Sequence, residues 1–166
     1  MEIKDCRITD KYVFFWGSVF SNWYSCIFMY EGERFNNSEQ AFMWEKARYF
    51  NDERSAAAIL KETNPRNVKA LGRRVAGFDV EKWAIISYIY MVGACYAKFN
   101  QNEDLKQQLL ATGDKTLVEA SPYDTIWGIG LGMDNDDILD ESKWRGMNLL
   151  GKALMVVRRT IKEENE

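Results

Sequence analysis

Only two prolines, Pro65 and Pro122, interrupt the 166 residues of this chain. Proline is the residue that most reliably ends a helix, so long stretches can continue as helix without a break. Apolar residues recur at helical spacing through much of the sequence, and start and stop signals mark the ends of each run. Helices are predicted over residues 38–51, 52–62, 64–75, 79–100, 102–113 and 145–164.

Local signals support several of these helix boundaries. Asp52 is suited to an N-cap, Pro65 stands just inside a helix start, and Gly113 suits a left-handed helix end. The helix that begins at residue 38 is predicted to be amphipathic, with Asn36 as its N-cap.

Strands are predicted in fewer places. The aromatic and β-branched segment 12–17 indicates a strand, segment 26–35 a hairpin with its turn at Glu31 and Gly32, and segment 116–120 a short strand. Segment 121–137 is predicted to be a loop. The sequence contains no repeat, low-complexity tract or linker. The predicted fold class is therefore α+β, a single compact, predominantly helical domain over residues 1–166 with a small antiparallel sheet.

Composition removes several classes of function. The formal charge is -3, and the sequence pI of about 5.2 argues against a non-specific binder of nucleic acid or membrane surfaces. The sequence has no histidine, which excludes Ser-His-Asp and Cys-His catalysis and any histidine-ligated zinc site. Its three cysteines are far apart and indicate free thiols. The charged N-terminus does not resemble a signal peptide, and no apolar run reaches the ~20 residues of a membrane span, so a cytoplasmic protein is expected.

The first predicted helix carries an acid and an amine on one side. Glu39 and Lys46 are seven residues apart, and Phe42 and Met43 lie between them on the same stripe. Each charge alone has an ordinary explanation, because Glu39 can cap the helix start and a lysine can extend its ammonium group into water. If the stripe faces a cleft, both charges instead converge on one ligand.

A second unusual segment lies in the loop after the last predicted strand. Gly128, Gly130 and Gly132 alternate behind Trp127, which offers a flat ring to a base, while the nearby Asp124 offers a carboxylate. This spacing is not the dinucleotide-binding G-x-G-x-x-G pattern. The alternative explanation is a plain surface loop with a buried Trp127.

Other segments add candidate ligand contacts. Asn22 and Trp23 lie in the aromatic segment "FSNWY", and Arg73, Arg74 and Lys82 are candidate contacts for an anionic group. For any single charged residue of this kind, a solvated surface position is the ordinary alternative.

Seven motifs occur in the order found in the NADAR family, also called YbiA-like, and the sequence resembles that family. They are "FSNW", "SEQAFMWEKA", "LGRRV", "KW", "LLATGDKTLVEAS", "DTIWGIG" and "RGMNLLGKALMVVR". The resemblance extends from about Phe14 to Arg158. It implies a largely helical α+β domain with N-glycosidase activity. The implied reactions are cleavage of the ribosylamine bond in early riboflavin-pathway intermediates and, in some branches, removal of ADP-ribose from guanine in nucleic acid.

The resemblance also assigns residues position by position. The family's helix acid and helix lysine fall on Glu39 and Lys46, and its loop Asp and Trp fall on Asp124 and Trp127. Its late Asn-x-x-Gly falls on Asn148 and Gly151.

Two positions depart from the family pattern. Gln40 stands where many members have histidine, and Ile129 stands where some have an acid. These departures bear on the substrate more than on the reaction.

Together these observations predict a site without a metal or organic cofactor. Glu39, Lys46 and Asp124 are the predicted catalytic residues; the predicted substrate contacts are Asn22, Trp23, Arg73, Trp127, Gly128, Gly130 and Asn148. The expected partner is a small phosphorylated N-riboside or ADP-ribosylated guanine, with nucleic acid only as a modified substrate. The competing class is a non-catalytic module that binds ADP-ribose or a nucleotide. Lys46 is either a covalent nucleophile or a charged phosphate ligand.

Overall fold

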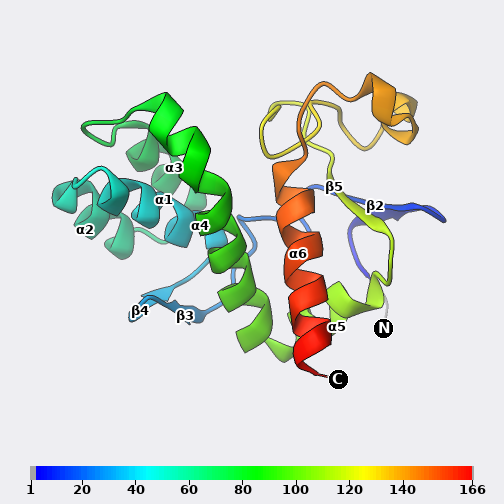
Figure 1. Cartoon of the computed structure of the whole chain (residues 1–166), viewed down its shortest axis with the longest axis horizontal. Coiled ribbons are helices and arrows are strands. Elements are labelled where there is room, and N and C mark those ends of the chain that lie inside the picture. Colours follow the sequence, from blue (N-terminus) through cyan, green and yellow to red (C-terminus); the bar gives the residue numbers. More distant parts are fainter. Residues whose placement is uncertain (1–2, 166) are drawn as a thin grey trace. The chain divides into compact units, whose positions relative to one another are not determined.

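The computed structural model describes residues 3–165, and these form two compact units. Unit 1 comprises the residues up to Ser21 together with those from Glu103 onward, and unit 2 comprises Asn22–Asn102. The elements of both units are labelled in Figure 1.

Unit 2 is built mainly from helices. Its elements are β3 (Phe28–Tyr30), β4 (Glu33–Phe35), α1 (Ser38–Tyr49), α2 (Glu53–Lys61), α3 (Pro65–Arg73) and α4 (Val80–Gln101). Helix α1 packs against α2, α3 and α4, so it is the central helix of the unit. All ten residues from Ser38 to Ala47 are buried. The expectation of an amphipathic first helix is therefore wrong, because neighbouring elements cover every side of α1 over those residues.

The hairpin of unit 2 forms where it was predicted. Strands β3 and β4 pair antiparallel, and the residues between them, Glu31 and Gly32, have φ angles of 50° and 80°. Two successive positive φ angles match the twist of the flanking strands, and glycine adopts the second without strain.

Unit 1 combines a three-stranded sheet with a short helix and a longer one. Its elements are β1 (Cys6–Ile8), β2 (Tyr12–Phe15), α5 (Glu103–Ala111), β5 (Thr116–Glu119), the 3₁₀ turns η1 (Asp136–Leu139) and η2 (Glu141–Lys143), and α6 (Leu149–Glu164). The strand order is β1-β2-β5, with β1 antiparallel and β5 parallel to β2. The α+β class and the helical majority are confirmed, but this sheet is mixed, whereas an antiparallel one was expected. A parallel neighbour is possible because the connection from β2 to β5 is long and includes α5.

The core of unit 1 lies between the sheet and the segment that follows it. Buried side chains of β2, β5 and the later loop form one cluster: Phe14, Val118, Ala120, Ile129, Leu131 and Ile138. Ile129 has no exposed surface, so the residue that departs from the family pattern is a core residue here. Helix α6 packs along β5, as the red helix and yellow strand show in Figure 1.

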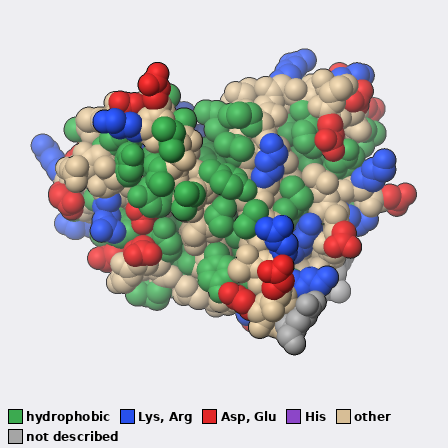
Figure 2. Space-filling view, in the orientation of Figure 1, with side chains coloured by type: hydrophobic (Ala, Val, Ile, Leu, Met, Phe, Trp, Pro, Cys, Tyr) green, Lys and Arg blue, Asp and Glu red, His purple; other side chains and the backbone are tan. Residues whose placement is uncertain are grey.

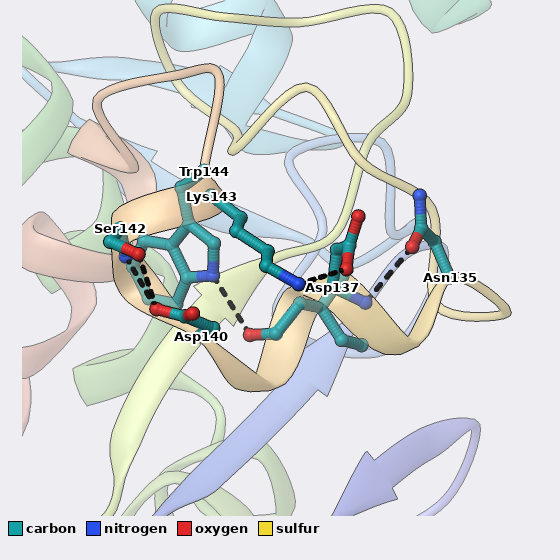
Figure 3. A network of polar contacts seen from close by, with 7 residues as sticks. Asn135, Asp137, Asp140, Ser142, Lys143 and Trp144 are labelled. Atoms are coloured by element: carbon teal, nitrogen blue, oxygen red, sulfur yellow. Dashed lines mark hydrogen bonds and ion pairs between the residues drawn. The ribbon is translucent and has the colours of Figure 1, made fainter.

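Several polar groups of the acidic segment before α6 are paired with one another. Asp140 accepts hydrogen bonds from the N–H and Oγ of Ser142 at 3.0 and 2.6 Å, and Lys143 pairs with Asp137 at 2.7 Å (Figure 3). The indole Nε1–H of Trp144 donates to the carbonyl oxygen of Ile138 at 2.8 Å. These contacts close the turns of η1 and η2, and no group of acidic or cysteine residues in the described part of the chain is arranged to hold a metal ion.

Surface apolar residues gather on one helix of unit 2. Val80, Ile85 and Ile89 of α4 are largely exposed, and Figure 2 shows hydrophobic side chains at the surface over this helix. Among the described helices, none has the length and apolar character needed to cross a membrane.

Candidate active site

The start of α1 is fixed by a cap that differs from the predicted one. Asn37, not Asn36, is the N-cap, and its side chain accepts from the N–H of Gln40 at 2.8 Å. The Gln40 side chain reaches back and accepts from the N–H of Asn36 at 2.8 Å. Gln40, rather than Glu39, therefore occupies the third helical position and plays the reciprocal part of the cap.

Gln40 also ties α1 to the end of α2. Its Nε2 donates to the carbonyl oxygens of Ile59, Leu60 and Glu62 at 3.0, 3.2 and 2.8 Å. These carbonyls belong to the last turn of α2 and to Glu62, the residue that caps it, where helix carbonyls lack partners within the helix. The residue that replaces the family's histidine is thus used to join two helices.

Asn22 anchors the same helix start from the other side. Its carbonyl oxygen accepts from the N–H of Glu39 at 3.0 Å, and its Oδ1 accepts from Oγ of Ser38 at 2.8 Å. Asn22 and Glu39 are each 8% exposed. Asn22 therefore positions Glu39 through the backbone; its predicted contact with substrate stays a prediction.

Lys46 lies two helical turns after Glu39 and is 9% exposed. Its Nζ lies 4.2 Å from the ring centroid of Phe78. Burial lowers the pKa of Lys46; the carboxylate of Glu39 opposes that shift, and the cation of Arg73 reinforces it. Two other predicted residues of unit 2, Glu39 and Arg73, are thus electrostatic neighbours of Lys46, and Arg73 lies in the last turn of α3.

A cluster of aromatic rings adjoins Lys46 through Phe78. Phe42 packs on Trp83 with ring centroids 5.2 Å apart, and Phe50 packs on both Phe78 and Trp83 at 5.4 and 6.2 Å. Tyr90 stacks on Trp83 at 5.9 Å. Phe78 and Trp83 were not among the predicted site residues. The available signal was the high aromatic content and the "KW" motif before the long helix.

Met43 does not share the position of Phe42. A Cβ added at Gly72 would overlap the sulfur of Met43, so Met43 packs directly on α3. The predicted stripe is therefore divided, with Phe42 at the Trp83 rings and Met43 in the packing between α1 and α3.

The glycine-rich loop belongs to unit 1 and is shaped by Asp124. The Oδ1 of Asp124 accepts from the N–H groups of Ile126 and Trp127 at 2.9 and 2.8 Å, and its carbonyl oxygen accepts from the N–H of Gly130 at 3.1 Å. A Cβ at Gly128 would lie 2.9 Å from the carbonyl oxygen of Asp124, so only glycine fits there without a shift. Gly130 has a φ of 70°. These two glycines are explained by the loop's own geometry, and their predicted ligand contacts stay predictions.

Asn148 joins the start of α6 to β5. Its Nδ2 donates to the carbonyl oxygen of Leu117 at 2.9 Å, and its Oδ1 accepts from the N–H of Glu119 at 3.0 Å. A Cβ at Gly151 would overlap the carbonyl oxygen of Leu117. The Asn-x-x-Gly motif is therefore a junction between helix and strand, and both ends of the Asn148 amide are engaged in it.

The ten predicted site residues are divided between the two units. Unit 2 holds Asn22, Trp23, Glu39, Lys46 and Arg73, and unit 1 holds Asp124, Trp127, Gly128, Gly130 and Asn148. Within unit 2, Glu39 and Arg73 are electrostatic neighbours of Lys46, while Trp23 is 42% exposed. Within unit 1, Trp127 is half-buried in the loop that Asp124 fixes.

This chain belongs to the NADAR domain family, whose pattern it matches over residues 14–162. It is 41% identical over 171 aligned positions to an N-glycosidase of Acanthamoeba polyphaga mimivirus, covering 95% of this chain and 98% of that protein. It is 31% identical over 143 positions to a protein of Vibrio vulnificus named for riboflavin biosynthesis, covering 86% of this chain but 35% of that protein.

A solved structure shows the same fold. The NMR structure of the Escherichia coli protein YbiA superposes with a TM-score of 0.78 at 26% identity, covering 98% of this chain and 91% of that chain. The Escherichia coli protein is itself named an N-glycosidase and is 30% identical over 139 positions, which cover 84% of this chain and 78% of that protein. The resemblance stated from the sequence motifs is thereby confirmed.

Proposed function

We propose that this protein hydrolyses the N-glycosidic bond between a nucleobase and a phosphoribose or ADP-ribose group. The enzyme class, a hydrolase of N-glycosidic bonds, is supported by relatives in the same family that are named N-glycosidases. The single observation that carries the proposal within this chain is the buried pair of Glu39 and Lys46 on α1, with the pKa of Lys46 lowered by burial.

The pair suits chemistry at C1 of a glycosylamine. Departure of the base requires a proton on its nitrogen, and the carbon left behind develops positive charge. A carboxylic acid can supply that proton, and the carboxylate then formed stabilises the charge. Glu39 is assigned this role, and it recovers its proton when water is consumed in the second half of the reaction.

Lys46 is assigned the role of nucleophile. Its neutral amine attacks C1 as the bond to the base breaks, and the sugar-lysine adduct opens to an imine. Water adds to the imine carbon, the C–N bond to Lys46 breaks, and the free sugar leaves with lysine restored. The lowered pKa of Lys46 supports this role, since only the unprotonated amine can attack. The ring of Phe78 opposes the lowering of the Lys46 pKa, because a cation over an aromatic face favours the ammonium form.

Two substrate classes are proposed. The name of the Vibrio vulnificus relative supports ribosylaminopyrimidine phosphates of riboflavin biosynthesis. The second class, ADP-ribosylated guanine, comes from the family resemblance. Trp127 is proposed to stack on the leaving base, and Asp124 to hold the loop that carries Trp127.

The function is tested by measuring base release from ribosylaminouracil phosphate, ADP-ribosylated guanosine and NAD. Release from either of the first two supports an N-glycosidase; binding without release from any of the three would show a binding module instead.

The covalent route is tested by adding borohydride during turnover. Reduction of the imine should leave a sugar adduct on the peptide that contains Lys46. Lys46→Arg keeps the charge but cannot form the adduct and should be inactive, whereas Lys61→Arg, at an exposed position of α2, is the matched control. An active Lys46→Arg enzyme with no trapped adduct would leave direct attack by water, with Glu39 as its base.

A further inference from the structure

The amine of Lys46 is covered by a side chain that is itself half exposed. Lys46 is 9% exposed, while Phe78, whose ring centroid lies 4.2 Å from Nζ of Lys46, is 45% exposed. The ring of Phe78 therefore lies at the boundary between the amine and solvent. A molecule that approaches Nζ from this side must first displace the ring.

The backbone around Phe78 is anchored on both sides. Phe78 lies in the connection from α3 to α4, where the N–H of Ala76 donates to Oδ2 of Asp52 at 2.8 Å. After it, Asp79 caps α4 by accepting from two N–H groups of the first turn at 3.0 and 3.1 Å. Only Gly77 lies with Phe78 between these anchors, and its φ of 71° suits glycine. Movement of the ring can therefore be confined to the Phe78 side chain and the adjoining glycine, without separation of the helices.

Two directional contacts hold the ring of Phe78 in this position. One is the contact with the ammonium group of Lys46, and the other is an edge-to-face contact with Phe50, whose ring centroid is 5.4 Å away at an interplanar angle of 70°. Phe50 packs in turn on Tyr49 and Trp83 at 4.9 and 6.2 Å, so its own position does not depend on Phe78. Contacts of both kinds are modest in strength, so the ring is held over Lys46 without being locked there.

The ring also affects the protonation of the amine that it covers. An aromatic face stabilises a cation, so Phe78 favours the ammonium form of Lys46. Two charged groups also act on the Lys46 pKa: Glu39 on the same helix raises it, and Arg73 on α3 lowers it. Neither charge lies on the connection that carries Phe78. Displacement of the ring therefore removes one stabilising contact from the ammonium group and leaves both charged neighbours in place.

We infer that Phe78 is a gate over the amine of Lys46: its ring covers the ammonium group in the free protein, and the sugar of the substrate displaces the ring as it binds. Displacement removes the cation–π contact, so the ammonium group releases its proton to water more readily and leaves the neutral amine that attacks C1. The inference rests on the proposed function and deepens it, because it couples substrate binding to activation of the nucleophile. Phe78 acts through Lys46 and is therefore a positioning residue.

Amine labelling tests the cover without turnover. Reaction of Lys46 with acetic anhydride, followed across pH by peptide mass spectrometry, gives a midpoint pH and a limiting rate at high pH. Phe78→Leu keeps an apolar cover but removes the aromatic face, so the midpoint should fall by about 0.4–1.5 pH units because the ammonium form loses its cation–π contact. Phe78→Ala removes the cover as well, so the limiting rate should rise above that of wild type. Phe78→Tyr keeps both properties and should match wild type in both values.

Two controls accompany these variants. Val80→Ala truncates another exposed apolar side chain at the start of α4 and should change neither value. Lys98 has no exposed surface, so its protection from labelling in the same digest shows that unit 2 stays folded. A wild-type limiting rate in folded Phe78→Ala, or a wild-type midpoint in Phe78→Leu, would overturn the inference. If Phe78→Ala loses the protection of Lys98, the midpoint of Phe78→Leu decides.

The pH dependence of turnover tests displacement of the ring. The acidic limb of kcat/KM reports the free enzyme, and the acidic limb of kcat reports the substrate complex. Because the ring covers Lys46 only in the free enzyme, Phe78→Leu should move the limb of kcat/KM to lower pH and leave the limb of kcat in place. Equal shifts in both limbs would show that the ring stays over Lys46 in the complex and would overturn the gate.

The same measurements separate the gate from the proposed function. A shift in the labelling midpoint of Phe78→Leu, with no shift in either kinetic limb, would count against Lys46 as the nucleophile and not against its contact with Phe78. If the wild-type protein releases base from neither ribosylaminouracil phosphate nor ADP-ribosylated guanosine, the proposed function fails. The labelling experiment still decides whether Phe78 covers the amine of Lys46 and favours its ammonium form.

Discussion

Replacing Asn148 should weaken unit 1 before it affects any contact with a ligand. The side chain is 2% exposed and makes two hydrogen bonds to the backbone of β5, one to the carbonyl oxygen of Leu117 and one from the N–H of Glu119. Asn148 also has a φ of 53°, in the left-handed region that asparagine tolerates better than most residues. Different substitutions of Asn148 can remove the hydrogen bonds with or without straining the left-handed backbone.

The expected losses follow from these contacts. Asn148→Gly keeps the left-handed backbone and removes both hydrogen bonds, leaving two backbone groups unsatisfied at about 1–3 kcal/mol each, or roughly 2–6 kcal/mol in the free energy of unfolding. Asn148→Ala should lose about 1 kcal/mol more, because alanine is strained at a positive φ. Asn148→Asp keeps the acceptor for Glu119 but sets a carboxylate oxygen against the carbonyl oxygen of Leu117 in a buried site, so it should lose at least as much stability as the glycine variant.

Urea unfolding followed by tryptophan fluorescence measures this order. Lys152→Ala, an exposed substitution on the same helix, is the control and should leave the unfolding midpoint unchanged. The reasoning is refuted if Asn148→Gly unfolds at the wild-type urea concentration. If that variant also loses activity at unchanged stability, Asn148 contacts the substrate, as the family pattern implies.

Three further predictions concern the proposed chemistry. Glu39→Gln should fold normally and lose activity by roughly 10²-fold or more, the usual scale for a lost acid-base group; Glu53→Gln, exposed on α2, is the control, and unchanged turnover in Glu39→Gln would remove the assignment. Trp127→Ala should raise KM through the loss of about 1–3 kcal/mol of stacking; a sharp drop in Tm with wild-type kinetics would identify Trp127 as a packing residue instead. Burial lowers the pKa of Lys46, so its amine becomes unprotonated as pH rises through a value below the ordinary 10.5. Labelling by an amine-reactive reagent should therefore rise at lower pH for Lys46 than for a model lysine, and coincident profiles would contradict the shift.

Most of the secondary structure could be predicted because its signals are local. The helix start at Pro65, the cap at Asp52 and the left-handed residue Gly113 depend on a few neighbouring residues and are confirmed. The hairpin turn at Glu31 and Gly32 is confirmed for the same reason.

The incorrect predictions concern structure that depends on contacts between segments far apart in the sequence. Strand β1 was missed because its three residues, Cys6–Ile8, show no alternation and become a strand only by pairing with β2. The parallel direction of β5 is set by a chain connection, not by the four residues of the strand. The N-cap was misplaced by one residue because Asn36 and Asn37 are both suitable, and only the carbonyls at the end of α2 select Gln40 as the reciprocal partner.

The candidate site shows the same division. The spacing of seven residues was enough to place Glu39 and Lys46 on one side of a helix. It could not show that Arg73 approaches them from α3 or that the ring of Phe78 lies over the ammonium group, because those contacts depend on how other elements pack. Nor could it show that residues Ser38 to Ala47 of α1 are all buried, so that Glu39 and Lys46 are not ordinary solvated charges.

On a helix with one open face, a lysine can extend its ammonium group into water, and Lys46 would need no further explanation. Burial removes that option and lowers the pKa of Lys46, but burial alone does not identify a nucleophile. Lys98 has no exposed surface, and burial lowers its pKa to about 8. The electrostatic neighbours that oppose this shift are the thiols of Cys26 and Cys95. Lys46 differs because its neighbour is Glu39, a group able to give a proton to a leaving base. The site of the borohydride adduct tests this distinction: an adduct on the peptide containing Lys98 would show that depth of burial, rather than the adjacent acid, selects the reactive amine.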